Sequence, residues 1–150
     1  MQGALSEHGQ LICHQLQAQG FVDRMGAEPG AAAALLEDEW NVAADVWSVT
    51  SYKELYNDAV ECERWNLLNP GKKAKQSYVS SQLAKEAGVF VAASDYMKVL
   101  PAALARWIPG PLHCLGTDGF GRRDSRELLR DFFEVDARYI VIAALLQLAE

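Results

Sequence analysis

The segment 115–127 contains the densest group of side chains in this chain that could carry chemistry. It reads LGTDGFGRRDSRE and contains three glycines, two aspartates and three arginines. Glycines lose more backbone freedom on folding than other residues do, so such a loop is more typical of a shaped contact than of a plain connector. Adjacent arginines can bind carboxylate or phosphate groups through several fixed N–H donors.

The candidate contact residues are the charged and large apolar side chains of this loop. They are Asp118, Phe120, Arg122, Arg123, Asp124 and Arg126. One interpretation is a loop that docks a neighbouring domain or subunit, or that frames an active site built elsewhere. The other is internal, with aspartates capping the next helix and arginines pairing with them. Asp124 lies at a good N-cap position and favours the internal interpretation. Arg122 and Arg123 favour the interface interpretation, and simple exposure on the surface explains them nearly as well.

The histidines form no recognisable metal or nucleophile pattern. His8 and His14 lie six residues apart, whereas two ligands on one helix face need a spacing of four, or else a third ligand nearby. Surface histidines are the simpler interpretation. His113 and Cys114 are neighbours in an expected strand, so their side chains point to opposite faces. A Cys–His nucleophilic pair is therefore not expected there.

Composition restricts the classes of protein to which the chain can belong. A length of 150 residues suits one domain, and a net charge of −6 argues against a general nucleic-acid binder. The longest apolar run, 139–146, is too short to span a membrane, and no signal peptide is evident. The three cysteines form no CxxC pair and no disulfide framework. We therefore expect a cytoplasmic protein with reduced thiols and no membrane or nucleic-acid partner.

Hydrophobic periodicity predicts alternating strands and helices. The expected strands are 45–50, 88–93 and 111–115; the expected helices are 4–19, 31–40, 52–68, 78–84, 96–107, 126–133 and 137–150. Ser51 and Asp136 are expected N-caps, Asp124 or Ser125 caps the helix at 126, and Pro101 predicts a kink or a late start in its helix. The alternation indicates an α/β fold with a mainly parallel sheet.

Several uncommon short sequence segments, taken in their order along the chain, resemble the C-terminal domain of the homodimeric, thiamine-diphosphate-dependent pyruvate dehydrogenase decarboxylating components. They are DVWSVTSY at 45–52, CERWN at 62–66 followed by Asn69-Pro70, SDYMK at 94–98, the loop 115–127, FEVD at 133–136 and YIV at 139–141. The resemblance covers about residues 31–150. It implies a three-layer α/β/α domain of the transketolase C-terminal type, with a five-stranded mixed sheet.

The first 25 residues do not show the family pattern, which has a strand and a Gly-Ser-Gly turn there. The chain instead begins MQGALSEHGQ. We therefore expect a non-family, helical segment at 1–25, a domain at 26–150 and a sheet whose first strand is missing. A truncated or fused product would have this organisation.

The resemblance also implies a reaction in which this chain has a supporting part. The family decarboxylates pyruvate with thiamine diphosphate and acetylates a lipoyl group of dihydrolipoyl acetyltransferase, on the way to acetyl-CoA. Its N-terminal domain holds the diphosphate and Mg²⁺, and its middle domain holds the pyrimidine ring. The chain has no Gly-Asp-Gly motif followed by Asn-Asn. Alone, it is therefore expected neither to bind the cofactor or a metal nor to be catalytic.

The expected role is to support subunit assembly and an active site formed by other domains. The implied partners are the N-terminal and middle domains of the same enzyme, a second subunit of a homodimer, and dihydrolipoyl acetyltransferase. Two alternatives remain open. The chain could be a stand-alone small-ligand-binding or regulatory module, because loops beyond strand ends in open α/β sheets often hold ligands. It could also be a gene fragment with no function of its own.

Overall fold

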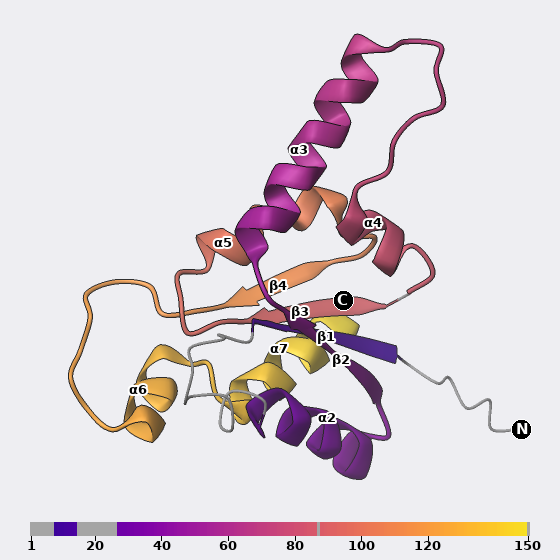
Figure 1. The fold of residues 1–150 in the computed structure, drawn as a ribbon. Coiled ribbons are helices and arrows are strands. Elements are labelled where there is room, and N and C mark those ends of the chain that lie inside the picture. Colours follow the sequence, from indigo (N-terminus) through magenta and orange to yellow (C-terminus); the bar gives the residue numbers. More distant parts are fainter. Residues whose placement is uncertain (1–7, 15–26, 87, 150) are drawn as a thin grey trace, which may run out of the picture.

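The computed structural model of this chain describes residues 8–14, 27–86 and 88–149 (Figure 1). Strands and helices alternate along it. In chain order they are β1 (His8–His14), α2 (Ala27–Trp40), β2 (Ala43–Val49), α3 (Tyr52–Leu68), α4 (Tyr78–Leu83), β3 (Val89–Ala93), α5 (Val99–Ala102), the 3₁₀ turn η1 (Ala105–Trp107), β4 (Leu112–Leu115), α6 (Arg126–Phe133) and α7 (Ala137–Leu148).

The sheet has four strands in the order β2-β1-β3-β4, and each neighbouring pair is parallel. Leu11 of β1 is in register with Val46 of β2 on one side and with Val91 of β3 on the other. All five residues of β3 are buried, as expected of a continuous apolar strand covered on both faces. The sheet is thus parallel throughout the described residues, where the resemblance implied five strands and a mixed sheet.

The predicted helix at 4–19 is wrong for residues 8–14, which form β1 in the interior of the sheet. The expectation that the first strand is missing is therefore also wrong. A short run such as Leu11-Ile12-Cys13 fits a strand as well as a helix. Pairing with β2 and β3 satisfies its backbone groups on both sides, and the sequence pattern alone does not reveal that pairing. The remaining residues of 1–25 lie outside the described part.

Helices cover both faces of the sheet, which confirms the three-layer α/β/α prediction. Figure 1 shows α2 and α7 below the sheet, and α3, α4 and α5 above it. Alternate residues of β3 point to the two layers. Val91 and Ala93 pack with Ile140 of α7 and Leu36 of α2, while Phe90 and Ala92 pack with α4 residues on the other side.

Side-chain hydrogen bonds cap the starts of α3 and α7 at the predicted residues. The Ser51 hydroxyl accepts from the Glu54 N–H at 3.2 Å, and the Asp136 carboxylate accepts from the N–H groups of Arg138 and Tyr139. For α6, Ser125 is the N-cap, whereas Asp124 accepts a hydrogen bond from the Ser125 N–H. Of the two candidates for this cap, the structure therefore selects Ser125.

The predicted helix at 96–107 is shorter than expected. It begins late, at Val99, ends at Ala102 and is followed by the separate turn η1. Pro101 lies in the first turn of α5, where a missing N–H costs nothing, which explains the late start. None of the described helices is long and apolar enough to cross a membrane.

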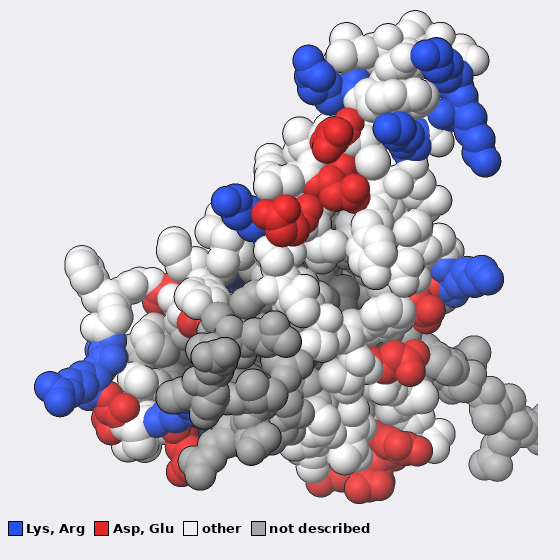
Figure 2. Space-filling model, in the orientation of Figure 1, with Lys and Arg blue, Asp and Glu red and all other residues white. Residues whose placement is uncertain are grey.

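Helix α3 projects away from the body of the domain (Figure 1). Its only buried residues are Tyr52 and Ala59, both in its first half. Near the middle, Glu63 accepts a hydrogen bond from Trp107 Nε1 at 2.9 Å and pairs with Arg106, which holds the helix to η1. Figure 2 shows Lys and Arg side chains gathered at the far end of α3 and on the loop that follows.

Candidate functional site

The loop 116–125 leaves the carboxyl end of β4 and is fastened at its start to the segment that follows β3. The Thr117 N–H donates to the Tyr96 carbonyl at 2.9 Å, and the Thr117 hydroxyl donates to the Asp95 carbonyl at 2.7 Å. Gly116 makes this approach possible, because a Cβ there would lie 2.5 Å from the Tyr96 oxygen. The loop therefore lies beyond the carboxyl ends of neighbouring parallel strands, where α/β sheets commonly build sites.

Asp118 holds the next part of the loop in place. Its Oδ1 accepts a hydrogen bond from the Lys98 N–H at 3.0 Å, and its Oδ2 lies 3.7 Å from Lys98 Nζ. Both side chains are about half exposed, so the ion pair itself adds little stability. The backbone hydrogen bond gives Asp118 a structural role within this chain.

Phe120 lies at the tip of the loop, and its side chain is 97% exposed. It stands between Gly119, whose φ is +96°, and Gly121. A positive φ is favourable for glycine and costly for other residues, so Gly119 allows the turn that presents this ring. Aromatic side chains are frequent anchors of protein interfaces.

The second half of the loop borders a shallow hollow of about 350 Å³ at the start of α6. Its lining includes Asp95, Thr117, Arg122, Asp124, Arg126 and Arg130. Of the sequence candidates, the structure thus brings together Arg122, Asp124 and Arg126. It does not add Asp118, Phe120 or Arg123 to this lining, although all three lie on the same loop. The Arg122 guanidinium lies 3.8 Å from the Phe132 ring centroid, a cation–π contact.

Arg130 is a residue of this hollow that the sequence analysis missed. It is 7% exposed, and its Nη1 lies 3.1 Å from Glu28 Oε1 while its Nε lies 3.7 Å from Asp95 Oδ1. The buried guanidinium joins α6 to α2 and to the end of β3. The available signal in the sequence was an arginine among the apolar positions of a short helix. Its partners, Glu28 and Asp95, are distant in the sequence, so the pattern alone did not show that this arginine is buried and paired.

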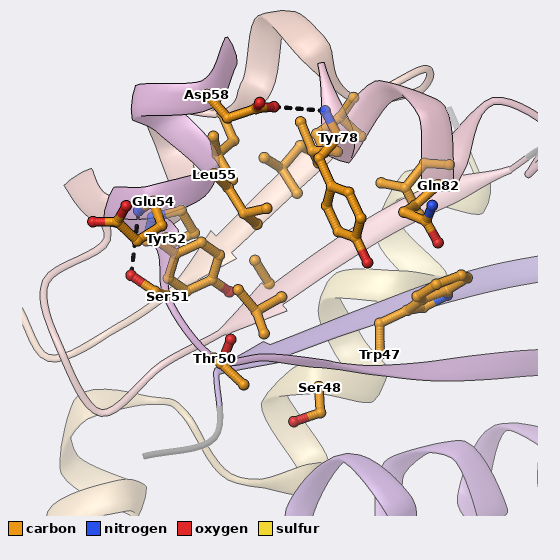
Figure 3. Close-up of a pocket in the computed structure, with 18 residues that line it drawn as sticks. Trp47, Ser48, Thr50, Ser51, Tyr52, Glu54, Leu55, Asp58, Tyr78 and Gln82 are labelled. Carbon is orange, nitrogen blue, oxygen red and sulfur yellow. Dashed lines mark hydrogen bonds between the residues drawn. The ribbon is translucent and has the colours of Figure 1, made fainter. Parts of the chain in front are cut away.

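A larger groove of about 760 Å³ lies on the sheet face covered by α3 and α4 (Figure 3). Trp47 of β2, Tyr52 and Leu55 of α3 and Tyr78 of α4 line it. Glu54, Asp58 and Gln82 supply its polar part. Asp58 accepts a hydrogen bond from the Tyr78 N–H at 2.6 Å, which fixes α4 against α3.

The sequence pattern does not indicate this groove. Alternation along β2 places Trp47 on the face toward α3, but the width of the space depends on how far α3 projects. Hydrophobic aromatic walls with a few polar groups are typical of ligand or partner grooves.

Cys62 and Cys114 are poor nucleophiles at neutral pH. Burial raises the pKa of Cys114 to about 11, and burial together with the nearby Asp58 carboxylate raises the pKa of Cys62. Cys114 packs against the cluster around Phe90. Because the thiolate is the reactive form, both thiols are mainly inert near pH 7.

The part of the chain that the structure describes has no group of side chains that could bind the metal ion that the resemblance implies. No three His, Cys, Asp or Glu side chains converge there in a way that could hold an ion. The side chains of His8 and His14 lie outside the described residues.

Curated proteins of similar sequence share one name. Curated proteins named "Pyruvate dehydrogenase E1 component" from Pseudomonas aeruginosa and Escherichia coli K12 are each 47% identical over 91% of this chain. The relative of that name from the Buchnera aphidicola of Acyrthosiphon pisum is 46% identical over 95% of the chain. The alignment with this relative covers 143 residues, which is more than the segment 26–150 contains. The similarity therefore extends into residues 1–25, which were expected to be unrelated to the family. The chain spans only 15–16% of these relatives' length.

A solved structure and a family model describe the same fold. The structure "Split gene transketolase, inactive beta4 tetramer" matches 96% of this chain and 40% of its own, with a TM-score of 0.53 and 18% identity, which supports the fold alone. Residues 27–136 match the family model of the transketolase-like TK C-terminal domain. That match covers well over half of the chain, and together with the three-layer architecture it shows that the chain belongs to the family of transketolase-like C-terminal domains.

Proposed function

We propose that this chain acts as the C-terminal domain of a pyruvate dehydrogenase E1 component, in the conversion of pyruvate to acetyl-CoA. The observation that carries the proposal is 47% identity over 91% of the chain to the Pseudomonas aeruginosa E1 component. Since the chain spans 15% of that relative, the remaining domains must supply most of the enzyme. The E1 components would act in the cytoplasm.

In this proposal the chain contributes contacts, and thiamine diphosphate and Mg²⁺ are held by the other domains. The loop with Phe120 is the surface through which it would meet a neighbouring domain or the second subunit of a homodimer. Exposure of 97% for the Phe120 ring supports this, because aromatic and arginine side chains supply much of the energy of interfaces. Dihydrolipoyl acetyltransferase would be the partner of the assembled enzyme.

A chimera tests the proposal directly. The segment of the Pseudomonas aeruginosa E1 component that matches this chain would be replaced by this chain, and pyruvate-dependent turnover measured with thiamine diphosphate and Mg²⁺. We expect activity within about tenfold of the parent, a difference of about 1.4 kcal/mol in transition-state stabilisation. A chimera that folds and binds the cofactor, yet has no turnover, would contradict the supporting role.

The loop is tested in the same chimera with Phe120→Ala and Arg122→Ala. We expect the variants to weaken assembly, seen as dissociation at higher protein concentration than the parent chimera. Lys53→Ala, an exposed change at the base of α3, is the matched surface control. Equal assembly of all variants would remove the loop from the interface.

Calorimetry on the isolated chain tests whether the cofactor is held by the other domains rather than by this chain. With thiamine diphosphate and Mg²⁺ we expect no measurable heat of binding. Binding with a dissociation constant near 1 µM, about −8 kcal/mol, would place a cofactor site in this chain and overturn the assignment.

A second candidate function is a small-anion module, favoured by the arginines that line the hollow at α6. Titration of the isolated chain with inorganic phosphate and with pyruvate, followed by NMR shifts, would test it. Saturable shifts at Arg122 and Arg126 that vanish in Arg126→Gln would favour this function over the first.

A further inference from the structure

The groove on the sheet face covered by α3 and α4 has the size of a small-molecule site. Its volume is about 760 Å³, and ligand pockets usually have volumes of about 300–1,000 Å³. Residues of β2, α3, α4, α5 and β4 all contribute to its lining, so the folded domain as a whole forms it. The function proposed above makes no use of this groove.

Three aromatic rings from three different elements face this space. Trp47 of β2, Tyr52 of α3 and Tyr78 of α4 line the groove, and Figure 3 shows their rings directed into it. Tyr52 is 4% exposed and is therefore held in place by packing, whereas Tyr78 is 60% exposed and is accessible to a ligand. The face of an aromatic ring attracts cations, and several rings around one space are typical of sites that bind organic ammonium groups.

The charged side chains that line the groove are both acidic. Glu54 and Asp58 are four residues apart on α3 and therefore lie on the same face of that helix. No lysine, arginine or histidine is among the lining residues in the described part of the chain. Figure 2 shows acidic side chains on the half of α3 nearer to the sheet. A cleft lined by charges of one sign concentrates ions of the opposite sign.

Asp58 combines a fixed position with capacity for a further contact. Its Oδ2 accepts the hydrogen bond from the Tyr78 N–H at 2.6 Å, which holds the carboxylate against α4. Because an ionised carboxylate can accept about four hydrogen bonds, Asp58 can also contact a bound cation. The residue is partly buried, so its attraction for a cation is screened less by water and salt than that of the exposed Glu54.

We propose that this groove binds a small organic ammonium ion, held by the rings of Trp47, Tyr52 and Tyr78 and by the carboxylates of Asp58 and Glu54. The two carboxylates disfavour an anion, and the negative faces of the rings do so as well. The volume favours a small molecule over a polypeptide segment. The proposal concerns surfaces of this chain alone and does not rest on its role in a longer enzyme.

An NMR titration with choline tests the proposal. The indole N–H signal of Trp47 is identified by its loss in Trp47→Phe, and choline is added to the unchanged chain at low salt. We expect a saturable shift of this signal with a dissociation constant of about 1 mM or below. The uncharged isostere of choline, in which C(CH₃)₃ replaces N(CH₃)₃⁺, should bind at least about tenfold more weakly because it lacks the charge.

Paired substitutions separate the contributions of charge and ring. Glu54→Gln with Asp58→Asn removes both charges while asparagine can still accept from the Tyr78 N–H, and the dissociation constant for choline should rise about tenfold or more. Tyr78→Leu should raise it about threefold or more, whereas Tyr78→Phe keeps the ring and should bind as the unchanged chain does. The control is Glu37→Gln with Glu61→Gln, which makes the same change in net charge at exposed sites outside the groove lining and should bind nearly normally.

Circular dichroism of each variant establishes that it is folded, and three results would then overturn the proposal. The first is the absence of a saturable shift with choline up to high millimolar concentration. The second is equal affinity for choline and its uncharged isostere, or an affinity that does not change when both carboxylates are removed. The third is binding of a lysine-containing peptide in the groove without binding of choline, which would make the groove a docking surface for a protein segment.

Discussion

Arg130 Nη1 and Glu28 Oε1 lie 3.1 Å apart and join two helices that are a hundred residues apart in the chain. The other oxygen of Glu28 accepts a hydrogen bond from the Ala137 N–H at 3.0 Å, at the start of α7. One carboxylate thus connects α2 with α6 and α7. The arginine is 7% exposed, so its charge depends on these partners rather than on water.

Replacing Arg130 with methionine should destabilise the domain strongly. The change leaves Glu28 without its charged partner, and breaking a buried pair costs about 3 kcal/mol at the lower end of the usual range. Urea unfolding of the isolated chain measures it. Glu28→Gln in the same background should recover part of the loss, since the orphaned charge is gone. Full stability of Arg130→Met alone would show that the pair contributes little.

Gly116→Ala should also destabilise the domain. The added methyl group would lie 2.5 Å from the Tyr96 oxygen and 2.8 Å from the Lys98 nitrogen, so the loop must move away from the segment after β3. We expect a loss of about 1–3 kcal/mol in the free energy of unfolding, typical of overpacking. Gly121→Ala is the matched control, because a Cβ there meets no atom within 4 Å. Equal stability of the two variants would contradict the close contact.

Asp136→Ala should shorten or loosen α7. Partial burial opposes ionisation of Asp136, but hydrogen bonds from the Arg138 side chain and from the backbone outweigh it and lower the pKa of the carboxyl. Loss of this N-cap should cost about 1 kcal/mol at pH 7. Because the folded pKa lies below the ordinary 3.8, the carboxylate stabilises the fold above about pH 4, and this stabilisation is lost as the pH falls through the lowered pKa.

Asp136→Asn separates the charge from the cap. Asparagine caps helices about as well as aspartate, so most of the stability at pH 7 should remain. Its stability should fall less than that of the unchanged chain as the pH drops below about 4. Thermal unfolding temperatures across this pH range give the comparison, and parallel profiles would rule out a contribution from the charge.

Cys114 should react slowly with iodoacetamide in the folded protein. Burial raises its pKa to about 11, so about one thiol in a thousand is ionised at pH 8. Peptide mapping by mass spectrometry should show labelling at least about tenfold slower than in urea, where the pKa returns toward 9.0. Since the unfolded thiol ionises first, stability should fall between about pH 9 and 11. Rapid labelling of folded protein would contradict the burial.

The sequence by itself determined features that depend on neighbours along the chain. Helix α3 was predicted with its observed bounds at 52 and 68, because its cap at Ser51 and its stop at Asn69-Pro70-Gly71 act within a few residues. The Asp136 cap and the buried strand at Val89–Ala93 were found for the same reason. The uncommon words at 45–52 and 62–66 were enough to point to the family.

Only the tertiary structure decided features that depend on distant partners. Residues 8–14 became a strand because β2 and β3 pair with them, although their local pattern fits a helix equally well. Burial of Arg130 depends on Glu28 and Asp95, which precede it by many residues. The loop 115–127 was recognised from its residues, yet which of them share the hollow at α6 was set by packing. Capping and turn energies are local, whereas strand pairing and the burial of charge exist only once distant segments meet.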